Sequence, residues 1–159
     1  MRSTVPIWLF GAFVAALGAR PALATSATAG VSASVGPSCS ITTTPVAFGP
    51  YTGTQIDTAG SVTAYCVNGT NWTIALGPGT GPGATPYNRS MTAGPYHLAY
   101  ALYSDAARTK IWGNTAGTDT VSGVGDGTPQ IVSVYGRVPA GALPGVGIYA
   151  DTVVASITF

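Results

Sequence analysis

The sequence predicts an all-β fold of the sandwich or barrel type, and three observations support this. Short runs rich in Val, Thr, Ile and Tyr recur along the chain, and Gly, Pro, Asn and Asp separate them. No run keeps apolar residues at helical spacing for three turns. The 159 residues include no Glu and a single Lys, so two good helix formers are nearly absent.

An export signal is predicted at the start of the chain. Arg2 supplies a positive charge, Val5–Leu17 is an apolar run, and Ala22-Leu23-Ala24 has the form that signal peptidase cleaves. The run is short for a membrane span. We therefore expect residues 1–24 to be a signal peptide, and the mature chain to begin at Thr25.

The mature chain begins with an alternating segment, Thr25–Val35, that predicts a β-strand. Gly36-Pro37-Ser38 separates it from the rest, so residues 25–38 form an extension with a linker. Such a strand either pairs in cis with its own domain or in trans with another subunit's sheet, and the pattern leaves both open. One face of this strand would carry Ala27, Ala29, Val31, Ala33 and Val35.

Residues 39–159 are predicted to form one β-domain, since no linker or repeat divides them. Asn68-Gly69 is a turn dipeptide typical of hairpins, so the strands on either side of it are predicted to pair. Core positions are predicted at Trp72, Leu98, Tyr100 and Leu102. The predicted strands are residues 40–48, 61–67, 72–76, 96–103, 110–112, 120–122, 131–138 and 147–159.

The last predicted strand has one apolar face, and the given sequence ends on it without a following hairpin partner. An unfilled sheet edge exposes unpaired backbone groups, which proteins normally cover. This ending favours pairing of the N-terminal strand in trans. The apolar face carries Val153, Ala155, Ile157 and Phe159.

Cys39 and Cys66 are predicted to form a disulfide, because a pair of cysteines in an exported chain is typical of a structural bridge. A metal site or a nucleophilic thiol are the alternatives. Both need further partners, and His97 is the only histidine.

Composition and motifs argue against several function classes. After residue 24 the chain has four Arg or Lys and five Asp, too little positive charge for nucleic-acid binding. The aspartates are scattered, and no hydrolase, metalloprotease or phosphate-loop motif occurs. We therefore expect no enzyme, no metal site and no cofactor. The aromatic residues leave open a monomeric, secreted carbohydrate-binding β-sandwich.

A series of short motifs runs in order along the mature chain. They are Cys39-x-Ile41, Phe48-Gly49-x-Tyr51, Gly60-Ser-Val62 leading to Cys66, Arg89-x-Met91, Leu98-x-Tyr100-x-Leu102-Tyr103, Trp112-Gly113, Val134-Tyr135-Gly136-Arg137-Val138, Gly147-x-Tyr149-x-Asp151-Thr152-Val153 and Thr158-Phe159. Together they resemble the spore coat protein U domain, a family that includes subunits of archaic chaperone–usher pili.

The resemblance implies an incomplete immunoglobulin-like β-sandwich that lacks its last strand. In such pili a periplasmic chaperone lends a strand to each subunit and an outer-membrane usher exports it. The N-terminal strand of the next, identical or related subunit then replaces the chaperone strand. Residues 25–35 would be the donor strand. The acceptor groove would lie along Tyr149, Val153, Ala155, Ile157 and Phe159.

The function implied is a structural one, a subunit of a surface pilus or spore-coat fibre that supports adhesion and biofilm formation. Export would pass through the periplasm to the cell surface. The donor face is mostly alanine, and an alanine contributes less on burial than the ~1.5–3 kcal/mol of a valine. Backbone pairing therefore supplies much of the binding free energy of the donor strand, or the acceptor pockets are shallow.

Overall fold

A computed structural model describes residues 23–159, so most of the predicted signal peptide lies outside the described residues. Residues 35–159 form one compact unit, and residues 23–34 belong to a separate one. In the described part of the chain no helix is long and apolar enough to cross a membrane. The strands are β1 (Cys39–Thr44), β2 (Ile56–Cys66), β3 (Asn71–Leu76), β4 (Arg89–Ala93), β5 (Tyr96–Tyr103), β6 (Val121–Val124), β7 (Pro129–Val138) and β8 (Ala155–Thr158).

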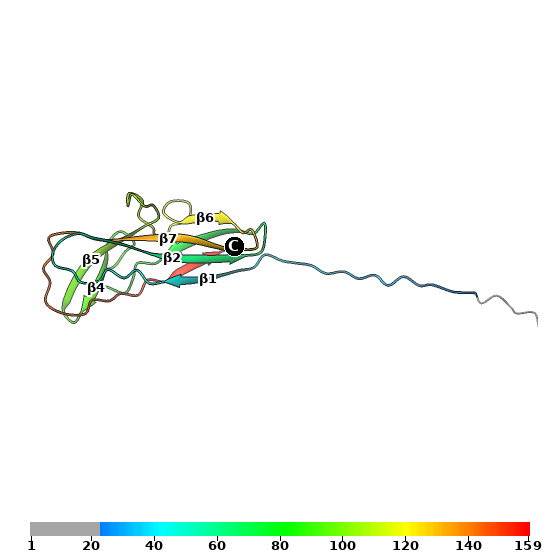
Figure 1. The fold of residues 1–159 in the computed structure, drawn as a ribbon, viewed down its shortest axis with the longest axis horizontal. Helices are drawn as coiled ribbons and strands as arrows, with labels where there is room; N and C mark the ends of the chain where they lie inside the picture. The colour runs from blue at the N-terminus through cyan, green and yellow to red at the C-terminus, as the bar shows by residue number, and fades with distance from the viewer. Residues whose placement is uncertain (1–22) are drawn as a thin grey trace, which may run out of the picture. The chain divides into compact units, whose positions relative to one another are not determined.

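These strands form two antiparallel sheets (Figure 1). One sheet has the order β1-β2-β7-β5-β4, and the other has the order β6-β3-β8. The longest pairing joins β2 and β7, from Ile56 opposite Val138 to Tyr65 opposite Pro129. The predicted all-β, immunoglobulin-like sandwich is confirmed.

The core lies between the two sheets, because alternate side chains of each strand point inward. All four predicted core residues are buried. Trp112, on the segment between β5 and β6, is fully buried and donates from Nε1 to the carbonyl of Ile74 at 3.0 Å. The buried apolar residues are Val62, Ala64, Cys66, Trp72, Ile74, Leu76, Leu98, Tyr100, Leu102, Trp112, Val134 and Val138.

The predicted hairpin at Asn68-Gly69 is wrong. A tight turn is present, with Gly69 at φ +81° and Thr70 N–H donating to the carbonyl of Val67 at 3.0 Å. The strands it joins lie in different sheets, because β2 pairs with β1 and β7, whereas β3 pairs with β6 and β8. Because the chain crosses from one sheet to the other at this turn, the apolar sides of β2 and β3 face each other across the core. In a hairpin, the two strands would lie side by side in one sheet.

Several strand boundaries also differ from the prediction. The first strand ends at Thr44 instead of residue 48, since Pro45 has no N–H for the ladder. Residues 110–112 make only an isolated bridge, between Tyr103 and Ile111. The last strand is Ala155–Thr158 and not 147–159. β4 was not predicted, and residues 25–35 lie outside every strand.

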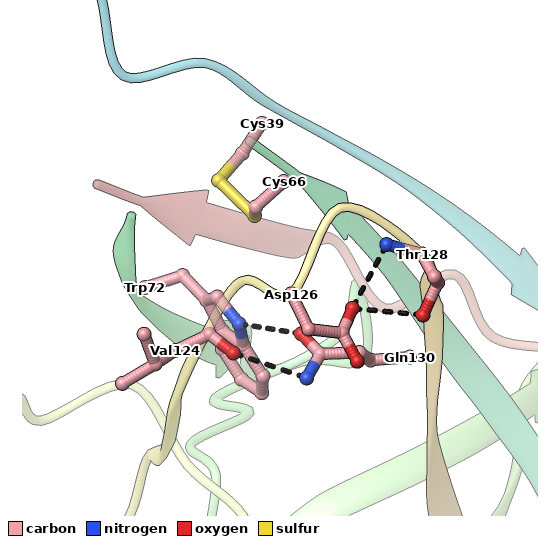
Figure 2. The surroundings of a disulfide bond; sticks show 7 residues. All are labelled: Cys39, Cys66, Trp72, Val124, Asp126, Thr128 and Gln130. Atoms are coloured by element: carbon pink, nitrogen blue, oxygen red, sulfur yellow. Dashed lines mark hydrogen bonds between the residues drawn. A yellow bond between two sulfur atoms is a disulfide. The ribbon is translucent and has the colours of Figure 1, made fainter. Parts of the chain in front are cut away.

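The predicted disulfide is present, between two residues that lie directly opposite each other in β1 and β2 (Figure 2). Beside it, Gln130 links the two sheets. Its Oε1 accepts from Trp72 Nε1 at 3.1 Å, and its Nε2 donates to the carbonyl of Val124 at 3.0 Å. The disulfide thus joins two strands of one sheet, and Gln130 joins that sheet to the other.

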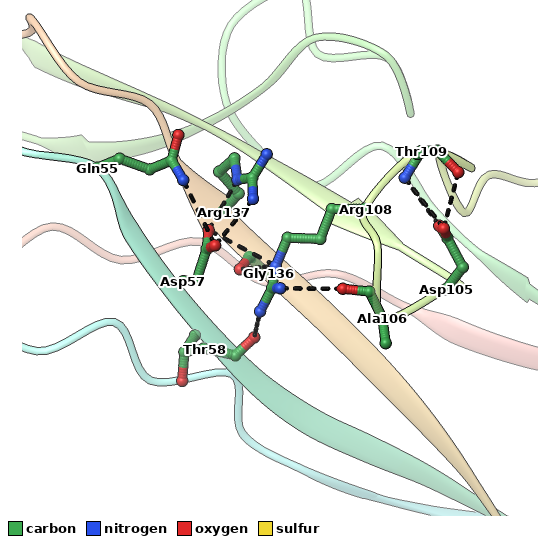
Figure 3. Close-up of polar contacts among 9 residues, drawn as sticks. All are labelled: Gln55, Asp57, Thr58, Asp105, Ala106, Arg108, Thr109, Gly136 and Arg137. Carbon is green, nitrogen blue, oxygen red and sulfur yellow. Dashed lines mark hydrogen bonds and ion pairs between the residues drawn. The ribbon is translucent and has the colours of Figure 1, made fainter.

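A charged cluster lies where β2 and β7 pair (Figure 3). Arg137 donates from Nε and Nη2 to the two carboxylate oxygens of Asp57, at 2.7 and 2.8 Å, and Arg108 approaches the same carboxylate at 3.6 Å. The hydrogen bond from Arg137 holds the pKa of Asp57 below its ordinary value. Because the pair is exposed, we expect it to fix register more than to stabilise the fold.

Candidate functional site

A groove of about 1150 Å³ lies between two parts of the chain that are mostly outside the strands. One wall is formed by residues 43–51, which continue from β1. The other is formed by residues 142–153, which lead into β8. Its floor is the apolar inner face of the sandwich, with side chains that include Val62, Leu98, Tyr100, Leu102, Val134 and Val138.

The edge strand β8 borders this groove. On one side β8 pairs with β3, and in line with that ladder Gly77 N–H donates to the carbonyl of Val154 at 2.8 Å. Backbone groups of successive residues in a strand point to opposite edges. The amide and carbonyl groups of Val153, Ala155 and Ile157 therefore point to the other edge of β8, with which no strand of residues 23–159 is paired.

Asp151 anchors the wall that precedes β8. Its Oδ2 accepts from the Tyr100 hydroxyl at 2.6 Å, and its Oδ1 accepts from Thr80 N–H, Thr80 Oγ1 and Thr152 N–H, each at 2.7 Å. Burial raises the pKa of this carboxyl, but the hydrogen bonds together outweigh burial, so the pKa lies below its ordinary value of 3.8. Burial and the bond to Asp151 raise the pKa of Tyr100. One carboxylate thus joins the groove wall to its floor and to the Gly-rich loop at residues 77–83.

We predict that Asp151→Ala lowers the free energy of unfolding by about 1–3 kcal/mol at pH 7, because the hydroxyl of the buried Tyr100 loses its acceptor. A carboxyl with a lowered folded-state pKa stabilises above its unfolded pKa, and this contribution is lost as pH falls through the folded pKa. The difference between wild type and variant should therefore shrink toward pH 2. Urea unfolding at pH 7 and pH 2 measures it.

Asp126→Ala is the matched control. Asp126 is exposed and accepts only from Thr128, through its N–H and its hydroxyl, both at 2.8 Å and away from the groove. Asp126→Ala should lower the free energy of unfolding less than Asp151→Ala does at pH 7, and it should have little effect at pH 2. An effect of Asp126→Ala equal to that of Asp151→Ala would argue against a special role of Asp151.

Arg89 is the only buried cation among the described residues, and its side chain is 1% exposed. It donates five hydrogen bonds, of 2.7 to 3.0 Å, to backbone carbonyls at the end of β3, before β4 and after β5. Burial lowers the pKa of the guanidinium. Its bonds tie three separate segments together beside the groove. The accepting carbonyls belong to Leu76, Gly77, Pro86 and Trp112.

The five residues predicted from sequence to form the groove are not all found there. Tyr149, Val153 and Ala155 line it. Ile157 packs against the core from β8, and Phe159 is 55% exposed; neither belongs to the lining. The wall at residues 43–51 was missed, and the alternation of Val46 and Phe48 after Pro45 is the only sequence signal for it.

The residues of the predicted donor face lie in the N-terminal extension, which forms no strand in the structure. Val31 is 96% exposed and Val35 is 82% exposed. The three alanines of this face are also exposed. An alternating, uncharged segment is thus presented to solvent along its whole length.

No three His, Cys, Asp or Glu side chains of residues 23–159 gather as metal ligands would. His97 is exposed on β5, next to the buried Leu98. The groove and the open edge of β8 are the candidate functional site.

The chain is similar to known proteins over most of its length. Residues 25–156 match the Spore Coat Protein U domain. The chain is 38% identical to Protein U of Myxococcus xanthus, over 87% of this chain and 88% of that protein. It also shares its fold with a solved structure, the CsuC–CsuE complex of a chaperone and a tip adhesion subunit before assembly, from the archaic chaperone-usher Csu pili of Acinetobacter baumannii.

That likeness has a TM-score of 0.57 at 23% identity, and it covers 77% of this chain but only 40% of the solved chain, so it shows the fold alone. The family match and Protein U each cover most of the present chain. The family match, over residues 25–156, spans all residues that line the groove. This chain belongs to the spore coat protein U domain family.

Proposed function

We propose that this protein is a structural subunit of a surface pilus or coat fibre, and that it polymerises by strand donation between copies. The observation that carries the proposal is the groove along the unpaired edge of β8. A chain laid there in extended form gains backbone partners and covers apolar side chains of the core. Segment 25–35 has the required features, since it alternates, has no charge and is exposed.

The edge chemistry fits an added strand. Backbone groups of Val153, Ala155 and Ile157 are directed to the open edge of β8. An antiparallel donor fits this edge best, because all other pairings of the sandwich are antiparallel and this geometry gives the stronger ladder.

A subunit with an open groove needs a cover before it assembles, because a free edge beside apolar side chains promotes aggregation. The fold is shared with a chain of a solved complex between a chaperone and a pilus subunit. We therefore assign a periplasmic chaperone as the first partner, an outer-membrane usher as the route of export, and adhesion and biofilm formation at the cell surface as the role of the fibre. No catalytic role is proposed.

The test compares two aspartates in the mature chain, Val31→Asp and Ser32→Asp. They are neighbours and lie on opposite faces of an extended strand. Val31→Asp should reduce the polymer fraction at least tenfold, because it removes a buried valine worth ~1.5–3 kcal/mol and brings an unpaired charge into an apolar groove. Ser32→Asp should assemble like wild type. Size-exclusion chromatography of protein from an oxidising periplasm gives the polymer fraction.

Two results would contradict the proposal. One is a wild-type chain that stays monomeric at all concentrations, as the alternative of a monomeric carbohydrate-binding sandwich requires. The other is an equal loss of polymer fraction in Val31→Asp and Ser32→Asp, because only the face that carries Val31 would be buried in the groove. Circular dichroism of each variant checks that the body remains folded.

A further inference from the structure

Two glycines create a depression in the floor beside the groove, and the groove wall occupies it. A methyl group added at Gly60 of β2 would lie 2.8 Å from the Pro45 carbonyl oxygen and 2.9 Å from Val46 Cγ2. One added at Gly136 of β7 would lie 2.6 Å from Val46 Cγ1 and 2.9 Å from Phe48 Cζ. Any side chain at these glycines would push the wall outward. The wall therefore reaches the floor only because both positions are glycine.

The positions of these glycines follow from the register of the five-stranded sheet. Gly60 lies opposite Val134, and Gly136 lies opposite Leu102 of β5, so both are on the inner face. A hydrogen bond holds the wall down between them, with Thr58 Oγ1 donating to the Ala47 carbonyl at 3.0 Å. The wall is thus attached to the floor at a defined height.

Val46 and Phe48 consequently fill part of the space between the sheets. Both side chains are partly buried and pack against the core. The Phe48 ring also meets the Tyr100 ring edge to face, with centroids 6.0 Å apart. All three residues line the groove. A strand laid in the groove would meet the Phe48 and Tyr100 rings in place of deep, empty pockets.

We infer that Phe48 and Val46 are specificity-determining residues, which restrict the groove to donor strands with small inward side chains. The inference rests on the proposed function and commits to one occupant, residues 25–35 of a second copy. Three of the five inward residues of that segment are alanine. Donor and groove are complementary in size. The small alanine side chains of the donor leave space between the sheets, and Val46 and Phe48 of the acceptor fill it.

The test enlarges the donor on one face at a time in the mature full-length chain. Ala29→Leu and Ala33→Leu add the same volume inward that Ser32→Leu adds outward. Each inward variant should lose at least tenfold in polymer fraction, whereas Ser32→Leu should match wild type. Combining an inward variant with Phe48→Leu should restore assembly, since removal of the ring makes room. Val46→Ala serves as a second, independent enlargement of the groove.

Size-exclusion chromatography and thermal melting are recorded for every variant. The inference is overturned if both inward leucines assemble as wild type does, if Ser32→Leu loses as much as they do, or if neither Phe48→Leu nor Val46→Ala restores any assembly. These failures differ from failure of the proposed function, in which wild type itself forms no polymer.

Discussion

Replacing Arg89 with methionine is expected to lower the free energy of unfolding by about 3–5 kcal/mol. The side chain is 1% exposed, and all five of its hydrogen bonds end on backbone carbonyls. Methionine has similar length but no donor, so buried carbonyls of three segments lose their partner together. An unsatisfied buried polar group is costly in a protein whose total stability is about 5–15 kcal/mol.

The end of β3 is where this loss should be felt most. Leu76 and Gly77 accept three of the five bonds, and Gly77 N–H bonds in turn to Val154, just before β8. Without Arg89, the ladder that positions the groove edge loses its support. We therefore expect the variant to assemble poorly even below its melting temperature.

Arg89→Lys is the matched control, because it keeps the positive charge and supplies donors from one nitrogen only. It should fall between wild type and Arg89→Met in urea unfolding at pH 7. If Arg89→Met unfolds within 1 kcal/mol of wild type, the buried network contributes little net stability. If Arg89→Lys is as unstable as Arg89→Met, the planar geometry of the guanidinium is the essential feature.

Strict alternation is what made part of this fold predictable. Residues 96–103 alternate without interruption and form a strand with those bounds, and all four residues predicted for the core are buried. Alternation of one apolar and one polar face follows from backbone geometry alone. Alternation alone was not sufficient, because residues 25–35 also alternate and form no strand in the structure.

The pairing of strands was less predictable, because a turn dipeptide specifies the local turn and not the sheet in which the next strand lies. Asn68-Gly69 makes its turn, yet β2 and β3 belong to different sheets. The choice depends on which apolar faces must meet across the core, and that is a property of the whole sandwich.

The candidate site was predicted only in part, for a related reason. Its walls at 43–51 and 142–153 lie mostly outside the strands, and the short alternation of Val46 and Phe48 is too brief to identify a wall. The effect of Gly60 and Gly136 arises from contacts with Val46 and Phe48, which neither the pattern nor the turn chemistry reveals. The role of Arg89 likewise depends on carbonyls from three distant segments.

Removal of the Cys39–Cys66 disulfide should lower the free energy of unfolding by about 3–4 kcal/mol, because the bridge closes a loop in the unfolded chain between residues 27 positions apart. The comparison is urea unfolding of the oxidised chain against the Cys39→Ser, Cys66→Ser double variant. Added reductant should destabilise wild type to the level of the variant and leave the variant unchanged. Equal unfolding midpoints for oxidised and reduced wild type would contradict this expectation.

The position of the bridge makes it matter for assembly as well as for stability. Cys39 is the first residue of β1, which follows the linker of the proposed donor segment and continues into the groove wall at residues 43–51. In a fibre held by donor strands, tension on the linker would enter the body at this residue. The disulfide passes that load directly to Cys66 on β2, which pairs with β1 and β7 in the five-stranded sheet. Fibres of the double variant should therefore break at lower force than wild-type fibres, because β1 can peel away from β2 and take the groove wall with it.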